Sequence, residues 1–222
     1  MATREPSPRL FQRWLEPTWQ PDPPLPKTLA ELPPGARICD LGAGGRRLTP
    51  QTRTVDLAPG PEVDVVADIH HVPLPDQSFE LVVSTGTLNL CRDPAQVAKE
   101  MARLLVPGGL VHLEIGLFQP YLPEPEDYHR FTLPGLRLLF GQVGIEELRS
   151  GAHIGPMSAL STAALYLVAD LLPGPAFWRR GLRGASHLAF GPLKYLDAAL
   201  PEATRERGPF AYGIYFVGRK AG

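Results

Sequence analysis

The chain has 222 residues, with 22 Lys and Arg against 23 Asp and Glu and a formal net charge of -1. This length favours one domain with an elaboration, and the balanced charge excludes general nucleic-acid binding because no basic field exists. Hydrophobic residues make up 44% of the chain and charged residues 20%, which excludes a disordered or fibrous protein.

The cellular compartment follows from the cysteines and the N-terminus. Cys39 and Cys91 lie inside apolar stretches, so we expect small buried thiols rather than a disulfide framework. Residues 1–14 have no continuous apolar run typical of a secretory signal, and we expect a cytoplasmic protein. Residues 157–172 are interrupted by polar side chains and fall short of the roughly 20 residues that span a bilayer. Membrane contact through their apolar face stays open as a less supported alternative.

Along the chain, residues 1–34 are rich in Pro and Trp and predict an extended arm, with at most two helical turns at 28–32. Short β-rich runs then alternate with helical patterns, which is typical of a mostly parallel sheet with helices on its faces. We expect strands at residues 37–41, 54–57, 63–67, 79–84, 110–115, 145–149 and 211–219. Helices are expected at 94–105, where Asp93 is the N-cap and Gln96 completes a capping-box pattern, and after Thr132.

The domain organisation predicted from these patterns has three parts: an arm at 1–34, an α/β core at 35–154 and 208–222, and an insertion at 155–207. Apolar residues recur at near-helical spacing in the insertion, which predicts helices. Such an insertion could cap the carboxyl end of the sheet and build a pocket, or it could serve dimerisation or membrane contact. The oligomeric state stays open.

The first motif with chemical meaning is the run Asp40-Leu41-Gly42-Ala43-Gly44, where a strand enters glycines. Glycine permits positive φ and lets a ligand approach the main chain. Judged alone, such a run is often only a tight turn. Arg47 stands where a dinucleotide fingerprint needs its third glycine, which disfavours a nicotinamide site.

Two acids follow at the ends of the next strands. Asp56 can accept both hydroxyls of a ribose with its two oxygens, although an exposed loop carboxylate is an equally good interpretation of that residue alone. Asp68 can accept from an exocyclic amine, while backbone groups near Ile69 can read the edge of an adenine ring.

Taken in order, these elements resemble the class I S-adenosylmethionine-dependent methyltransferases over about residues 30–150, and residues 212–220 resemble their closing strand. The resemblance implies a Rossmann-like, mostly parallel sheet with an antiparallel closing strand, S-adenosylmethionine as cofactor and a small-molecule methyl acceptor. It places the methionine moiety at Asp40, Gly42, Ala43 and Gly44, the ribose at Asp56 with Leu57 beside it, the adenine at Asp68 and Ile69, and the sulfonium near Ser84.

A subgroup with an Asp-Tyr-x-Arg-Phe-Thr motif is also resembled, at residues 127–132. Tyr128, His129 and Arg130 are therefore candidate catalytic residues on the acceptor side, where a base or an anion clamp can be placed. Arg130 could equally tie the loop to Asp127 or Glu126.

Three departures from that family define an alternative function. The relatives usually carry another glycine at Arg46 and Glu-His at Asn89-Leu90, and only residues 58–64 separate the second strand from a short third one. These changes would suit a catalytically idle fold that binds a ligand or a partner. No metal site is expected, since His70 and His71 are adjacent without a third ligand at suitable spacing. His112 alternates with apolar neighbours, which favours a hydrogen-bonded core histidine.

Overall fold

The computed structural model describes residues 18, 20, 23–122, 126–171, 185–186, 188–200 and 210–222. These residues form two compact units. The sheet unit comprises residues 23–117, 121–151 and 213–222, and the helical unit contains the described parts of residues 1–22, 118–120 and 152–212.

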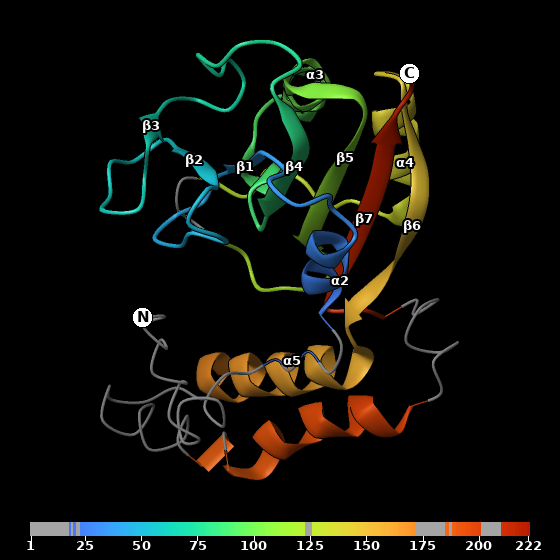
Figure 1. The fold of residues 1–222 in the computed structure, drawn as a ribbon. Helices are drawn as coiled ribbons and strands as arrows, with labels where there is room; N and C mark the ends of the chain where they lie inside the picture. Colours follow the sequence, from blue (N-terminus) through green and yellow to red (C-terminus); the bar gives the residue numbers. More distant parts are fainter. Residues whose placement is uncertain are drawn as a thin grey trace, which may run out of the picture. The chain divides into compact units, whose positions relative to one another are not determined.

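A seven-stranded sheet in the order β3-β2-β1-β4-β5-β7-β6 is the centre of the sheet unit (Figure 1). Its strands are β1 (Ile38–Leu41), β2 (Arg53–Asp56), β3 (Val65–Val66), β4 (Phe79–Thr85), β5 (Leu105–Gly116), β6 (Ile145–Ile154) and β7 (Gly213–Lys220). Strands β1 to β5 pair in parallel, and β7 pairs with β5 in the antiparallel sense. The predicted fold class, a Rossmann-like sheet with an antiparallel closing strand, is confirmed.

Helices cover both faces of this sheet. On one face, α4 (Leu133–Gly141) stacks Phe140 on Phe216 of β7 with ring centroids 5.3 Å apart, and α3 (Pro94–Leu104) packs beside α4. On the other face, Leu25 of α2 (Pro24–Ala30) joins a buried cluster with β1, β4 and β5. The predicted extended arm is therefore wrong for residues 24–27, because Pro24 starts a helix whose apolar side is buried, and the helical turns expected at 28–32 begin earlier and end at Ala30. Most of residues 1–22 lie outside the described part of the chain.

The predicted cap of α3 is confirmed in part. The Asp93 carboxylate accepts a hydrogen bond from Gln96 N at 3.0 Å, as an N-cap should. The Gln96 amide does not close a capping box, because it donates instead to the carbonyl of His70 at 3.0 Å. This bond ties the start of α3 to the loop that follows β3.

Strand lengths differ from the sequence-based expectation at β3, β5 and β6, and β6 runs to Ile154 instead of ending at 149. The third strand has only 2 residues, which confirms the expected shortness. Strand β5 begins at Leu105, earlier than expected, because the backbone pairs with β4 across a register shift before Leu110. Gly108 absorbs this irregularity with φ 76°.

The helical unit contains α5 (Pro156–Leu171) and the 3-10 helix η2 (Gly191–Ala199), so the predicted helices are confirmed for the described residues. Buried Asp197 of η2 accepts hydrogen bonds from Met157 N at 2.9 Å, from Ser158 N at 3.0 Å and from the Ser158 hydroxyl at 2.8 Å. A carboxylate at a helix N-terminus satisfies free N–H groups and complements the helix dipole. Within the described residues, every helix is too short or too polar to cross a bilayer.

The two cysteines lie in the sheet unit, Cys39 within β1 and Cys91 directly after the 3-10 helix η1 (Leu88–Leu90). Both thiols are buried and unpaired by disulfides. Burial raises the pKa of each to about 12, because the thiolate form loses its hydration in the apolar interior. The expected buried thiols are confirmed.

Candidate functional site

The carboxyl ends of β1, β2 and β4 meet at one edge of the sheet, where the polar residues of the candidate site gather. Asp40 pairs in register with Val83, so Asp40 and Thr85, two residues beyond Val83, lie on the same face. The edges of open parallel sheets at their carboxyl ends are where α/β folds bind ligands.

A tight turn follows β1. The N–H groups of Gly42 and Ala43 both donate to the carbonyl of Val55, at 2.8 and 3.2 Å, which fixes the turn on the end of β2. Gly42 has φ 75° and Gly44 φ 59°, in the left-handed region that glycine adopts most easily. A Cβ at residue 42 would also overlap the side chain of Thr87, so the turn after β1 and the segment after β4 approach each other closely there.

Asp40 is fully buried beneath Arg46. Nε and Nη2 of Arg46 lie 3.3 Å from Oδ2 of Asp40, and Nη2 also donates to the hydroxyl of Thr85. Among the described residues, Oδ1 of Asp40 has no hydrogen-bond partner. Burial raises the pKa of this carboxyl, and the charge of Arg46 opposes that shift.

Asp56 lies next to the glycine turn, as the sequence predicted. Its Oδ2 accepts from Gly44 N at 2.7 Å and its Oδ1 accepts from Ala58 N at 3.0 Å, so each oxygen keeps a further lone pair. Leu57 beside it is 65% exposed, which is unusual for a large apolar side chain at the end of a sheet strand. An exposed apolar side chain can pack on the ring of a nucleoside while the neighbouring carboxylate accepts hydrogen bonds from its sugar.

Asp68 and Ile69 lie on the loop after β3. Oδ1 of Asp68 accepts from His70 N at 2.9 Å and lies 2.5 Å from His70 Nδ1, and the backbone bond is the main reason that the pKa of Asp68 is lowered. The side chain of Ile69 is buried, so only its backbone faces the edge. The hydroxyl of buried Ser84 donates to the carbonyl of Leu41 at 2.9 Å and so joins β4 to β1.

The predicted acceptor-side residues pack against η1, which follows β4. The carbonyl of Asn89 accepts from the N–H groups of both Tyr128 and His129 at 3.0 Å, and Arg92 donates to the Tyr128 hydroxyl at 2.8 Å. These bonds attach the loop that carries both side chains to η1 and to Arg92. Oδ1 of Asn89 is buried without a partner among the described residues.

Arg130 pairs with Asp127 through two nitrogens, which is the tie that the sequence left open as an alternative. The Asp127 side chain is 1% exposed and also accepts from Leu122 N at 3.1 Å. The hydrogen bonds from Arg130 hold the pKa of Asp127 below its usual value. The pair fixes the shape of the loop that carries Tyr128 and His129.

His112 is the core histidine that the alternation of β5 predicts. Its Nδ1 lies 2.9 Å from the Thr28 hydroxyl of α2, and its Nε2 lies 3.3 Å from Glu114. Sequence reasoning missed Thr85 and Glu114, which pair in register at the ends of β4 and β5. Counting every second residue from Val83 and His112 could have placed both on the face of Asp40.

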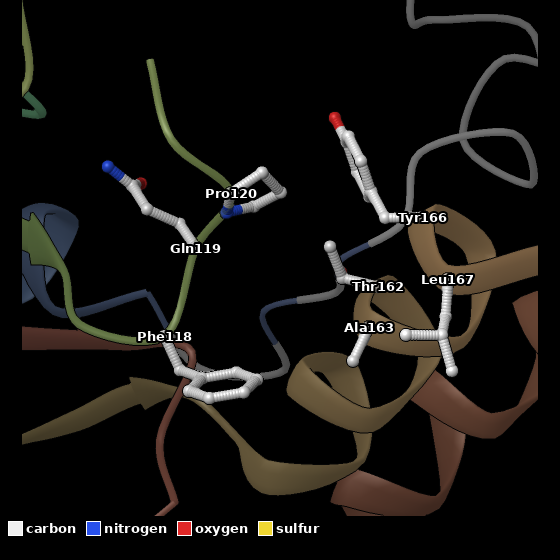
Figure 2. Close-up of a pocket in the computed structure, with 7 residues that line it drawn as sticks. All are labelled: Phe118, Gln119, Pro120, Thr162, Ala163, Tyr166 and Leu167. Carbon is white, nitrogen blue, oxygen red and sulfur yellow. The ribbon is translucent and has the colours of Figure 1, made fainter. Parts of the chain in front are cut away.

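The helical unit has a separate pocket of about 370 Å³, within the size range of small-molecule sites (Figure 2). Residues from α5 and from the segment that continues β5 line it: Phe118, Gln119, Pro120, Thr162, Ala163, Tyr166 and Leu167. In Figure 2 the Gln119 amide turns away from the space between Pro120 and Tyr166, so the pocket wall is mainly apolar.

Comparison with known proteins identifies the sheet unit. A family model described as a methyltransferase domain matches residues 41–113, the segment from the glycine turn to β5. The chain carries a class I, S-adenosylmethionine-dependent methyltransferase domain. A malonyl-[acyl-carrier protein] O-methyltransferase from Halorhodospira halophila is 32% identical to this chain over 131 residues, which are 49% of this chain and 40% of the relative. The chain therefore spans less than half of that relative.

Solved structures place the methyltransferase fold over most of the chain. A phosphoethanolamine N-methyltransferase from Haemonchus contortus, in complex with phosphomonomethylethanolamine and S-adenosylhomocysteine, has a TM-score of 0.56 at 16% identity over 88% of this chain and 51% of its own. A 1,6-didemethyltoxoflavin N1-methyltransferase from Burkholderia thailandensis has a TM-score of 0.52 at 14% identity, covering 84% of this chain and 72% of its own. Identities this low establish the fold alone.

The residues at the edge of the methyltransferase domain fit a ligand that carries an ammonium group and a ribose. Oδ1 of Asp40 is a buried acceptor without a donor among the described residues. A Cβ at Gly44 or Gly86, both with positive φ, would meet no described atom within 4 Å, which leaves room for a ligand against the main chain.

Proposed function

We propose that this chain transfers the methyl group of S-adenosylmethionine to a small-molecule acceptor. The observation that supports this most strongly is the arrangement at the sheet edge. The turn Gly42–Gly44, Asp56 and Asp68 follow three neighbouring strands in the order β1, β2 and β3, in a domain that matches the methyltransferase family. The three parts of the cofactor require three such groups side by side.

The proposed cofactor contacts follow that order. Asp40, Gly42, Ala43 and Gly44 would hold the methionine moiety, and Ser84 would support the main chain beside the sulfonium through its bond to Leu41. Asp56 would bind the ribose with its free lone pairs and Leu57 would cover the adjoining ring. Asp68 and the backbone of Ile69 would read the adenine edge.

When bound, S-adenosylmethionine supplies the methyl carbon, whose bond to sulfur breaks as the acceptor's nucleophilic atom forms its bond to that carbon, leaving the electron pair on sulfur. The chain's residues contribute chiefly by holding the two reactants in line and close together. A base is needed only where the acceptor carries a proton, and His129 is the proposed base because its backbone is bonded to η1, which follows β4.

The acceptor is proposed to be a small molecule with an oxygen or nitrogen nucleophile. The similar proteins described above include an O-methyltransferase and an N-methyltransferase. The mainly apolar pocket in the helical unit is a separate candidate site for an apolar small molecule.

The function is tested by incubating the purified chain with S-adenosylmethionine and a pool of small metabolites. Mass spectrometry should detect S-adenosylhomocysteine together with a new product heavier by one methylene group. Cofactor bound in calorimetry without turnover on any pool would instead favour the idle, ligand-binding alternative. An absence of cofactor binding would contradict the proposal.

Replacing Asp56 by Ala is expected to weaken binding of S-adenosylhomocysteine by roughly 1.5 to 3 kcal/mol, the range for hydrogen bonds to a charged group. Titration calorimetry measures the effect. Asp56→Asn keeps one acceptor oxygen, and its affinity for S-adenosylhomocysteine should lie between those of Asp56→Ala and the parent chain. Unchanged affinity in Asp56→Ala, with an unchanged melting temperature, would place the ribose elsewhere.

Replacing His129 by Ala is expected to lower turnover by about 100-fold while cofactor affinity stays within about twofold, since general-base catalysis contributes roughly 10² to 10⁴ in rate. Phe131→Ala is the matched control, because the Phe131 ring packs 5.6 Å from that of His129. An equal loss in both variants would show that His129 only supports the loop.

A further inference from the structure

Arg46 lies in the proposed cofactor site and contacts residues at the ends of two neighbouring strands. Its guanidinium reaches Asp40 at the end of β1 and the Thr85 hydroxyl at the end of β4. Arg46 N donates to the Ala43 carbonyl at 3.2 Å, so residue 46 closes the turn that the glycines open. The backbone of Arg46 is thereby fixed, while its side chain is 43% exposed over a fully buried carboxylate.

The geometry of this ion pair is loose compared with others in the same chain. Both nitrogens of Arg46 lie 3.3 Å from one oxygen of Asp40, and the other oxygen has no described partner. At the opposite end of β1, Arg37 meets Glu80 as a fork, with Nη2 2.7 Å from Oε1 and Nε 3.2 Å from Oε2. Charge-assisted bonds are typically 2.7 to about 2.9 Å long, so the Arg46 pair is the easier one to open.

We propose that Arg46 and Asp40 exchange this mutual contact for the two charged ends of the cofactor's amino-acid group. The Asp40 carboxylate then accepts from the α-ammonium, and the Arg46 guanidinium donates to the α-carboxylate. The inference deepens the proposed function and rests on it. Arg46 is in this account a residue that selects ligands with an intact amino-acid end.

Charge and shape both support the exchange. An α-amino acid is a zwitterion, so its ammonium replaces the positive group that Asp40 loses and its carboxylate replaces the negative group that Arg46 loses. No buried charge is left unpaired, which would otherwise be strongly unfavourable. The planar guanidinium fork matches the two oxygens of a carboxylate better than an ammonium does.

The test compares two ligands that differ only in the amino-acid end: S-adenosylhomocysteine and 5′-methylthioadenosine. In Arg46→Met, affinity for S-adenosylhomocysteine should fall by about tenfold or more, while affinity for 5′-methylthioadenosine stays within about twofold. Arg46→Lys, which keeps the charge without the fork, should give an intermediate loss. Arg37→Met is the matched control, and it should change neither affinity because Arg37 precedes β1 at the opposite edge.

Each other outcome overturns the inference in a distinguishable way. Equal losses for both ligands, with a lower melting temperature in Arg46→Met, would make Arg46 a support for the turn. Tighter binding of S-adenosylhomocysteine by Arg46→Met would make Arg46 an obstacle. Unchanged affinities would remove Arg46 from the site while leaving the proposed function intact. Failure of the parent chain to bind S-adenosylhomocysteine would overturn the proposed function as well.

Discussion

Replacing Gly42 by Ala is expected to lower the free energy of unfolding by roughly 2 to 5 kcal/mol and to abolish cofactor binding. A left-handed backbone is unfavourable for a residue with a Cβ by about 1 to 2 kcal/mol. The added methyl group would also overlap the Thr87 side chain, and overpacking a tight contact destabilises by about 1 to 3 kcal/mol. Urea unfolding followed by far-ultraviolet circular dichroism measures the loss.

Two glycines in the same turn provide matched controls. Gly44→Ala has the strained backbone, φ 59°, without an overlapping neighbour, and should lose only about 1 to 2 kcal/mol. Gly45 has neither feature among the described residues, and Gly45→Ala should be nearly neutral. Equal effects at Gly42 and Gly44 would mean that Thr87 moves aside and that the close approach of the turn after β1 and the segment after β4 is unimportant.

Replacing Asp127 by Ala is expected to lower the free energy of unfolding by about 1.5 to 3 kcal/mol, the range for hydrogen bonds to a charged group, because the Arg130 side chain left behind is 32% exposed. The variant leaves Arg130 without this carboxylate and removes the acceptor for Leu122 N and for the Asn89 amide. The loop that carries Tyr128 and His129 would keep its backbone bonds to the Asn89 carbonyl but lose the side-chain bond that Asp127 accepts from Asn89 of η1. Differential scanning calorimetry measures the stability change, and turnover should fall with it.

Acid unfolding provides an independent measure of the same pair. Because the folded pKa of Asp127 is lowered, its stabilisation is fully present above the ordinary Asp pKa of about 3.9 and is lost as the pH falls through the folded pKa. The stability difference between the parent chain and Asp127→Asn should therefore shrink below about pH 4. A difference that stays constant down to pH 2 would mean that the charge of Asp127 does not contribute to the free energy of unfolding.

The fold was largely predictable because local patterns and global arrangement agree in this chain. The run of residues 79–84 is apolar enough for a buried central strand, and Asp93-Pro94 marks the start of α3 without ambiguity. The exceptions have a common cause. Leu25 and Thr28 become buried only through contacts with distant strands, and β5 extends through Pro107 and Gly108 only because β4 lies beside it. Such tertiary effects leave no local signal.

The candidate site was predictable in position but not in its pairings. Strand ends fixed the neighbourhood of Asp40 and Asp56, since carboxyl ends of parallel strands meet at one edge. From the sequence, Arg46 was visible only as a residue that replaces a glycine of related proteins. Its contact with Thr85, which is 39 positions away along the chain, depends on the fold. Likewise, two alternatives for Arg130 were equally compatible with the motif, and only the fold selects Asp127.

The buried thiols of Cys39 and Cys91 allow local unfolding of the native chain to be measured by their rates of alkylation. A thiol with a pKa near 12 carries almost no thiolate at neutral pH, and both sulfurs are also shielded from reagents. Alkylation at either position therefore reports only the openings that expose it. Cys39 precedes Asp40 within β1, whereas Cys91 follows η1, where the loop of Tyr128 is attached. Peptide mapping of a slow alkylation time course thus distinguishes opening at the end of β1 from opening of the loop that carries Tyr128, in the unlabelled, unmutated protein.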